Sequence, residues 1–319
     1  MFEKPNALVT GANGFVGRFL LNRLRTSDNF NASGSVRAAN KSTTNNLTAI
    51  GAIHGKTDWS SALNGKQLVV HTAARAHIMQ DNAVDPLSEF RKINVDGTES
   101  LARQSAAAGV RRFVFISSIK VNGEQTNPGK PFTASDLVAT DDPYGISKLE
   151  AEQKLWAIGR ETGMEIVVIR PTLVYGPGVK GNFASLIRLV QKGLPLPFGA
   201  ISNKRSLVGL DNLVDLIIAC LDHPAAANQV FLVSDGRDLS TTELLRTLAE
   251  ADGKRARLIP VPEGLLEFSA ALLGKRAMAR RLLGSLQVDI SKNRELLGWT
   301  PPFSVEEGLK RCFTGYQDK

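Results

Sequence analysis

The chain has 319 residues and a formal net charge of +8, with 43% hydrophobic and 22% charged residues. This composition is typical of a globular protein, and the length suits two domains or one large one. The basic residues are scattered, without the aromatic-rich basic stripe of a nucleic-acid-binding protein, so we expect no nucleic-acid partner. The longest apolar stretches are too short to span a membrane and no cleavable signal opens the chain, which predicts cytoplasmic localisation and no stable membrane insertion.

The first predicted unit is a strand, a glycine turn and a helix. The apolar run Ala7-Leu8-Val9 precedes Thr10-Gly-Ala-Asn-Gly-Phe-Val-Gly17, and an amphipathic helix is expected over 15–25. In such a turn the glycines permit a tight bend and a close approach to a pyrophosphate, and the free N–H groups of the helix start face the anion. The unit predicts a dinucleotide site that includes Gly11, Asn13, Gly14, Phe15, Val16 and Gly17.

The end of the second predicted strand bears on the choice of dinucleotide. Ala32-Ser-Gly-Ser-Val-Arg37 carries no acidic residue to receive the ribose hydroxyls of NAD. A guanidinium at Arg37, with Lys41 adding charge, suits a 2′-phosphate through paired hydrogen bonds. We therefore favour NADP(H), with NAD(H) as the alternative if Arg37 is an ordinary surface residue. Asp58, after the third strand, is the expected adenine contact, with Trp59 beside it.

A second motif predicts chemistry as well as binding. Asp141-Asp142-Pro143 is a good helix start, and in the helix expected over 144–160 Tyr144 and Lys148 share one face. A free phenol titrates near 10, so work near neutral pH needs a lowered pKa, for which Lys148 is a direct source. The buried strand Phe113-Val-Phe-Ile116 ends in Ser117 and Ser118, and strand ends are where doubly wound sheets bind ligands.

These motifs resemble an extended short-chain dehydrogenase/reductase of the nucleotide-sugar epimerase, dehydratase and ketoreductase group. Besides the glycine turn, the two serines and Tyr144 to Lys148, the resemblance rests on His71-Thr-Ala-Ala74, Asn94-Val-Asp-Gly-Thr98, Arg170-Pro171, Val174-Tyr-Gly-Pro177, Lys204 to Val208 with Asp211, and Leu297-Gly-Trp-Thr-Pro301. It implies a Rossmann-type doubly wound parallel sheet, catalysis by Ser118, Tyr144 and Lys148, and a homodimer built on helices 86–108 and 144–160.

The resemblance also implies further site residues. On the cofactor side these are Ala73, Ala74 and Asn94, besides Tyr144 and Lys148. On the side of a UDP-sugar substrate they are His77, Ser118, Asn182, Arg205 and Arg281. One departure is Val121-Asn122-Gly123, where many relatives have Val-Tyr-Gly, which alters only the expected substrate wall. His71 is expected to be a packed residue, and neither it nor the cysteines Cys220 and Cys312 predict a metal site or a disulfide.

The region after Arg170 changes character. We predict a dinucleotide domain over 1–170 and about 206–235, because 229–233 reads as a strand that returns to the sheet. A smaller, mainly helical substrate domain is expected over 171–205 and 236–319, with a short strand near Leu258-Ile259. The apolar stretch 265–273, followed by Lys275 and Arg276, is compatible with a membrane surface, but we expect it to cover the core of the small domain.

Three functions are open at this point. The favoured one is NADPH-dependent reduction of a UDP-4-keto-6-deoxy-N-acetylhexosamine for surface polysaccharide. The alternative is an NAD-dependent 4-epimerase acting on UDP-hexose or UDP-N-acetylhexosamine, which uses the same three side chains. A noncatalytic dinucleotide-binding regulator is disfavoured because Ser118, Tyr144 and Lys148 are all present. A dehydratase is disfavoured because the Asp-Glu pair that those enzymes use for elimination is missing.

Overall fold

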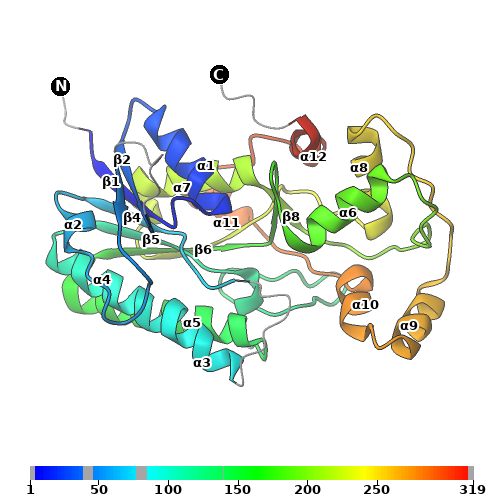
Figure 1. The fold of residues 1–319 in the computed structure, drawn as a ribbon, viewed down its shortest axis with the longest axis horizontal. Helices are drawn as coiled ribbons and strands as arrows, with labels where there is room; N and C mark the ends of the chain where they lie inside the picture. The colour runs from blue at the N-terminus through cyan, green and yellow to red at the C-terminus, as the bar shows by residue number, and fades with distance from the viewer. Residues whose placement is uncertain (1–3, 39–45, 77–84, 139, 315–319) are drawn as a thin grey trace.

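A seven-stranded parallel sheet forms the centre of the computed structural model, which describes residues 4–38, 46–76, 85–138 and 140–314 (Figure 1). The strand order is β3-β2-β1-β4-β5-β6-β9. From β1 the chain first adds strands toward one side of the sheet and then, from β4, toward the other side. Doubly wound sheets bind dinucleotides at this switch point between β1 and β4. The bounds are β1 (Asn6–Thr10), β2 (Asn31–Val36), β3 (Leu47–Ala49), β4 (Leu68–His71), β5 (Arg112–Ile116), β6 (Glu165–Pro171) and β9 (Gln229–Val233). The predicted fold class is confirmed, including the return of 229–233 to the sheet.

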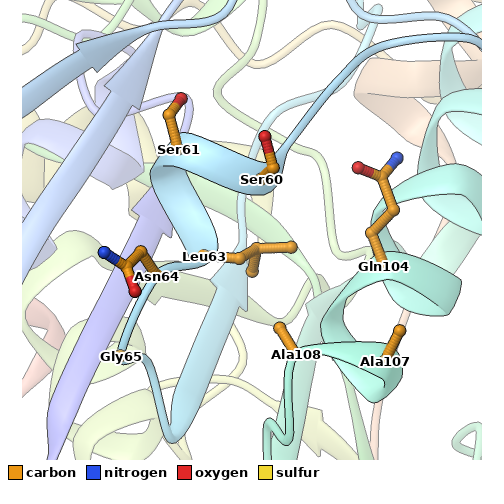
Figure 2. A pocket seen from close by; sticks show the side chains of 8 residues that line it. All are labelled: Ser60, Ser61, Leu63, Asn64, Gly65, Gln104, Ala107 and Ala108. Atoms are coloured by element: carbon orange, nitrogen blue, oxygen red, sulfur yellow. The ribbon is translucent and has the colours of Figure 1, made fainter.

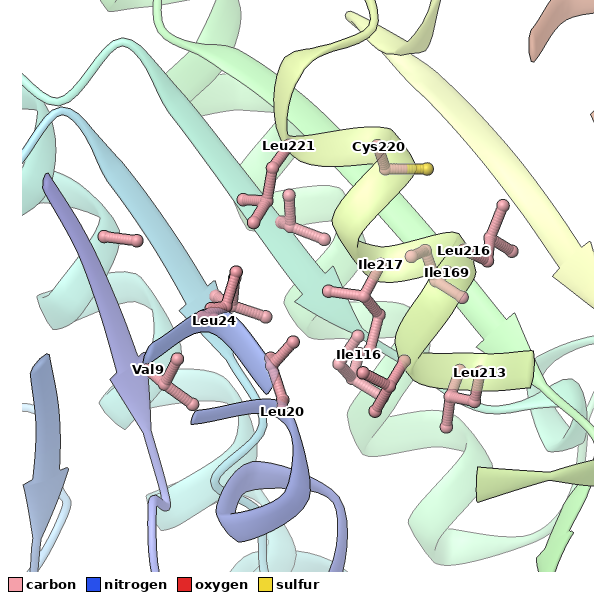
Figure 3. Close-up of a cluster of buried hydrophobic side chains, with 14 of the residues drawn as sticks. Val9, Leu20, Leu24, Ile116, Ile169, Leu213, Leu216, Ile217, Cys220 and Leu221 are labelled. Carbon is pink, nitrogen blue, oxygen red and sulfur yellow. The ribbon is translucent and has the colours of Figure 1, made fainter. Parts of the chain in front are cut away.

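Helices cover both faces of this sheet (Figure 1). On one face α1 (Phe15–Arg25) packs beside α7 (Leu210–Asp222), and their leucines and isoleucines meet apolar residues of β1, β5 and β6 in one buried cluster (Figure 3). The other face carries α2 (Ser60–Leu63), α3 (Pro86–Phe90), α4 (Gly97–Ala107) and α5 (Pro143–Thr162). The central strands β1, β4, β5 and β6 are mostly apolar and buried because both of their faces are covered, whereas β2 also carries small polar residues.

The helix predicted over 86–108 contains a wider turn. A π-helical stretch, η1 (Arg91–Asp96), separates α3 from α4, and it holds Asn94. Such stretches often occur at functional sites. The predictions over 15–25 and 144–160 match α1 and α5. Asp142 accepts the N–H of Gly145 (2.9 Å) at the start of α5, and Gly163 ends that helix in the left-handed conformation (φ 77°).

The rest of the chain builds a second core. β7 (Leu173–Tyr175) and β8 (Leu207–Gly209) form a two-stranded parallel sheet, against which α6 (Gly181–Gln191), α8 (Thr241–Ala251) and α12 (Val305–Thr314) pack. Two short 3₁₀ turns, η2 (Ile119–Val121) and η3 (Pro224–Ala226), and α11 (Ser291–Leu297) complete the main elements. The strand expected near Leu258 is reduced to a single bridge with Leu196. The two-domain division stays a prediction.

The prediction for residues 265–273 was wrong. All but the last of them lie in α9 (Glu263–Leu272), which pairs with α10 (Arg276–Leu283) at one end of the molecule (Figure 1). None of the ten residues of α9 is buried, so this helix does not cover the second core. Among the described residues, no helix combines the length and the apolar character needed to cross a bilayer.

Candidate active site

The glycine turn lies between β1 and α1, at the carboxyl edge of the sheet. Gly11 has a positive φ of 66°, and a Cβ there would lie 2.9 Å from the Ala73 Cα. A Cβ on Gly17 would collide with the Gly11 carbonyl oxygen. Gly14 differs, because its extended backbone (φ −75°, ψ 174°) suits any residue and its Cβ would meet only the Gly11 oxygen, at 3.0 Å. Apart from this one tight contact, the space around a Gly14 Cβ is open.

The start of α1 suits an anion. Gly14 is its N-cap and offers no side-chain oxygen, so no side chain of the cap residue satisfies the first N–H groups, which include those of Phe15, Val16 and Gly17. A pyrophosphate in front of Gly14 would accept these N–H groups and lie at the positive end of the helix dipole. The geometry of the turn therefore fits a dinucleotide, and Gly11, Gly14 and Gly17 lie in the unit of strand, turn and helix that the sequence predicted.

The end of β4 forms the neighbouring wall. His71 is fully buried between the hydroxyls of Thr10 (2.7 Å) and Thr98 (3.0 Å), and burial lowers its pKa to about 3. It is a packed, neutral residue, as the sequence indicated. The Thr72 hydroxyl donates to the Thr10 carbonyl oxygen (2.6 Å), which fixes the path of the chain toward Ala73 and Ala74.

The adenosine side of the predicted site is more open. Arg37 directly follows β2 and its side chain is exposed, as a residue that receives a 2′-phosphate must be. Asp58 is also exposed, and its carboxylate accepts the Ser60 N–H (2.9 Å), which lowers the pKa of Asp58. The Trp59 side chain is completely buried in the core with residues of α4, and its backbone N–H donates to the Gln104 amide oxygen (2.8 Å), so its side chain does not contribute to an open adenine site.

The strongest constraint on the catalytic motif comes from Lys148. Its Nζ atom donates to the Ile116 carbonyl oxygen (2.9 Å), which ties α5 to the end of β5. The same Nζ lies 4.4 Å from the Phe115 ring centroid and 5.9 Å from that of Tyr144. Lys148 is 2% exposed. The helix therefore places Tyr144 and Lys148 together at the strand end, as the spacing of four residues predicted.

The protonation of this pair differs from the sequence-based expectation. Burial lowers the pKa of Lys148 to about 7, although the nearby Glu152 carboxylate raises it. The pKa of Tyr144 is raised, mainly by burial and further by the Asp142 charge. The expected lowering by Lys148 was wrong for the chain alone, because desolvation outweighs a cation that itself loses its proton near neutrality.

Ser118 is held close to the start of α5 by a separate contact. It is the N-cap of η2, where its Oγ accepts the Lys120 N–H (3.2 Å). The Lys120 ammonium group pairs with the Asp142 carboxylate (2.7 Å), which also caps α5. One ion pair thus joins the turn that carries Ser118 to the turn that carries Tyr144.

Asn94 connects the cofactor side to the catalytic helix. Its amide nitrogen donates to the Ser147 hydroxyl (3.0 Å) and to the Arg75 carbonyl oxygen (3.1 Å), and its amide oxygen accepts the Arg75 N–H (2.8 Å). The side chain is buried in η1. It therefore holds the loop after Ala73 and Ala74 against α5, in agreement with the expected structural role.

The sequence reasoning missed a buried ionic network behind Ser118. Glu152 pairs with the Arg170 guanidinium (2.5 Å) and accepts the Ser117 hydroxyl (2.5 Å), and Arg170 also donates to the Asn122 amide oxygen (3.0 Å). The position of Glu152, four residues after Lys148, was the available signal. Asn122, which replaces the tyrosine of many relatives, is thus part of the scaffold below η2.

The predicted substrate residues are distributed around the second core. Arg205 is partly buried and its Nη1 donates to the Gly284 carbonyl oxygen (2.9 Å), next to the end of α10. Arg281 lies exposed on α10, and Asn182 lies exposed at the start of α6. His77 falls outside the described residues. The structure brings Arg205 and the end of α10 together, but gives no contact between them and Asn182.

A hollow of about 660 Å³ lies elsewhere, between α2 and the end of α4 (Figure 2). It is lined by small and polar residues such as Ser60, Asn64, Gln104 and Ala108. Gly65 also lines it, three residues before the start of β4, so the hollow lies at the amino edge of the sheet. The glycine turn and the predicted catalytic residues follow the carboxyl ends of the strands, at the opposite edge. This hollow is therefore separate from the predicted cofactor site.

Comparison with known proteins agrees with this geometry. The NAD-dependent epimerase/dehydratase family matches residues 7–234. A UDP-glucose 4-epimerase of Vibrio cholerae is 52% identical, over 95% of this chain and 93% of its own length. An Escherichia coli N-acetyl-alpha-D-glucosaminyl-diphospho-ditrans,octacis-undecaprenol 4-epimerase is 26% identical, over 96% and 93%. The structure of a UDP-glucose 4-epimerase of Thermotoga maritima with UDP-glucose superposes with a TM-score of 0.74 at 25% identity, covering 96% of this chain and 97% of that one.

The family match covers more than half of the chain and spans the glycine turn, Ser118 and the Tyr144–Lys148 pair. The parallel sheet supplies the expected dinucleotide edge, and α5 places the predicted catalytic residues Tyr144 and Lys148 at that edge. This chain belongs to the NAD-dependent epimerase/dehydratase family and is an NAD(P)-dependent enzyme of the extended short-chain dehydrogenase/reductase type.

Proposed function

We propose that this enzyme is a 4-epimerase of a UDP-linked hexose or N-acetylhexosamine. The observation that carries the proposal is the 52% identity, along nearly the whole chain, to a protein named as a UDP-glucose 4-epimerase. The more distant relative from Escherichia coli is also named as a 4-epimerase of a sugar on a diphosphate. Both therefore favour the alternative over the 4-ketoreductase that the sequence alone favoured.

The side chains at the carboxyl edge support a C4 reaction of this kind. The Ser118 hydroxyl would hold the C4 oxygen of the sugar, and Tyr144 would remove its proton as the C4 hydrogen leaves as hydride. The dinucleotide, when bound, supplies the hydride acceptor and a positively charged ring that opposes the raised pKa of Tyr144. Tyr144 then returns the proton after the 4-keto sugar has presented its other face, so no net oxidation occurs.

Burial of Lys148 has a consequence for this reaction. Because its pKa is lowered to about 7, the amine of the free chain is neutral above that pH and charged below it. A phenolate at Tyr144 would raise the pKa of Lys148 again, since the two groups share one buried site. The pair would thus titrate as a coupled acid and base, in which the charge on Tyr144 alters the pKa of Lys148.

NADPH-dependent reduction of a 4-keto sugar is the second candidate, and one observation favours it. Arg37 follows β2 with its guanidinium exposed, at the position where a 2′-phosphate would be recognised. A reductase must exchange its dinucleotide at each turnover, whereas an epimerase retains it. The retained dinucleotide is therefore the property that separates the two candidates.

The test uses the purified protein with no added dinucleotide. Incubation with UDP-glucose, and separately with UDP-N-acetylglucosamine, should give the C4 epimer of at least one sugar by nuclear magnetic resonance, and denaturation should release NAD. The opposite result is no epimer from either sugar together with NADPH consumption when a UDP-4-keto-6-deoxy-N-acetylhexosamine is added. The homodimer implied by the family resemblance stays a prediction, which sedimentation of the same sample tests.

A further inference from the structure

The paired helices α9 and α10, called here the α9–α10 hairpin (residues 263–283), expose an apolar stripe. Leu265, Phe268 and Leu272 recur at the spacing of one helical face and are 55%, 62% and 74% exposed. Leu273 and Met278 extend the apolar surface toward α10 and are also exposed. Single exposed apolar residues are common on protein surfaces, but a contiguous stripe marks a surface that contacts another apolar phase.

The hairpin is attached to the protein at both ends. The Ser202 N–H donates to the Glu263 carboxylate (3.0 Å) at the start of α9. At the end of α10, the Asn203 amide nitrogen donates to the carbonyl oxygens of Leu282 (3.1 Å) and Gly284 (2.9 Å), and the Thr241 hydroxyl donates to Leu282 (2.5 Å). The exposed stripe is therefore presented by a fixed protrusion.

The charged residues next to this stripe indicate what kind of surface it contacts. Four exposed cations lie in or next to α10, and residues 273–284 contain no acidic side chain; the cations are Lys275, Arg276, Arg280 and Arg281. At 100° per residue, Glu267 lies about 200° around α9 from Leu265, away from the stripe. Apolar side chains followed along the chain by a run of cations complement an anionic lipid surface, where the cations meet phosphates and the apolar groups enter the acyl boundary.

We propose that the α9–α10 hairpin docks this enzyme on an anionic bilayer surface. Leu265, Phe268 and Leu272 enter the boundary between headgroups and acyl chains, and Lys275 and Arg276 lie over the headgroup phosphates. Because the hairpin ends beside Arg205, docking places the predicted sugar-diphosphate residues close to the membrane. The inference goes beyond the proposed reaction and does not depend on which sugar is turned over.

The experiment is flotation of the full chain with vesicles made of equal parts phosphatidylcholine and phosphatidylglycerol. The protein should float with these vesicles, float less at high salt, and stay unbound with phosphatidylcholine alone. Replacing Leu265, Phe268 and Leu272 together by Ser should abolish flotation. The double variant K275Q/R276Q should weaken binding about fivefold for each lost cation.

Two controls keep these results interpretable. R23Q/R25Q removes the same charge from the exposed end of α1, far from the hairpin in Figure 1, and should float like the wild type. The triple Ser variant should keep its turnover and thermal unfolding temperature in vesicle-free buffer. Wild-type protein that fails to bind anionic vesicles would overturn the proposal. So would a triple Ser variant that still binds, or one that changes only from dimer to monomer, because the stripe would then be an interface between copies.

Discussion

The carboxyl edge of the sheet and the α9–α10 hairpin place charged and apolar side chains in opposite ways. At the carboxyl edge, Lys148, Glu152 and Arg170 are buried and each contacts a defined partner. On the hairpin, Leu265, Phe268 and Leu272 of α9 are exposed, and no residue of α9 is buried. Desolvation makes buried charges costly even when they are paired, and exposing apolar surface is unfavourable, so both regions give up stability. The first does so to fix reacting groups, and the second to leave a surface free for docking.

The largest expected effect is at Tyr144. Tyr144→Phe should lower kcat at least about a hundredfold, the usual size of a general acid or base contribution, while the protein folds and retains its dinucleotide. Tyr175→Phe is a matched control, since that hydroxyl donates to Asp235 (2.6 Å) in the second core. It should cost about 1–3 kcal/mol of unfolding free energy and leave kcat nearly unchanged. Equal kinetic losses in both variants would contradict the assignment of Tyr144.

The glycine turn allows a ligand-facing position to be separated from a packing position. Gly14→Val should abolish retention of the dinucleotide with little change in unfolding temperature of the dinucleotide-free protein, because its backbone is extended and the added atoms occupy the open space. Gly17→Ala should instead destabilise the chain by roughly 1–3 kcal/mol through overpacking against the Gly11 carbonyl. Absorbance of released dinucleotide and thermal unfolding measure both effects. Full dinucleotide retention by Gly14→Val would refute the phosphate role of the turn.

Arg37 should have a smaller, selective effect. Arg37→Asp should weaken binding of NADPH relative to NADH by about tenfold to a hundredfold, because a charge-assisted hydrogen bond contributes about 1.5–3 kcal/mol and a like charge replaces it. Fluorescence titration with both dinucleotides gives the ratio. Arg25→Asp, on the exposed end of α1, is the control and should leave the ratio unchanged. An unchanged ratio in Arg37→Asp would make Arg37 a surface residue without a role in cofactor choice.

The smallest expected effect is a pH dependence of stability at His71. Its pKa is about 3 when folded and about 6.5 when unfolded, so between these values the unfolded chain binds a proton that the folded chain does not. This contribution is fully present above pH 6.5 and is lost as the pH falls, by about 1.4 kcal/mol per pH unit. His71→Gln should lack that slope. Urea unfolding of both proteins at pH 7 and pH 5 tests this, and parallel slopes would contradict it.

The sequence predicted the parts of the fold that local patterns determine. The glycine turn, the spacing of Tyr144 and Lys148, and the apolar strands all follow from short-range rules, and they predicted the sheet and its carboxyl edge. The pKa of Tyr144 could not be predicted from spacing, because desolvation depends on the side chains that surround it in three dimensions. The exposure of α9 was equally hidden, since an apolar helix has the same sequence pattern whether or not another element covers it.

In the proposed reaction, hydride leaves C4 and returns to it without leaving the enzyme. UDP-glucose carrying deuterium at C4 tests it most directly, with no added dinucleotide and with the product analysed by mass spectrometry and nuclear magnetic resonance. The 4-epimer should form and keep its deuterium at C4. An epimer that has exchanged its C4 deuterium for solvent hydrogen, or failure to form any epimer from UDP-glucose or UDP-N-acetylglucosamine, would contradict it.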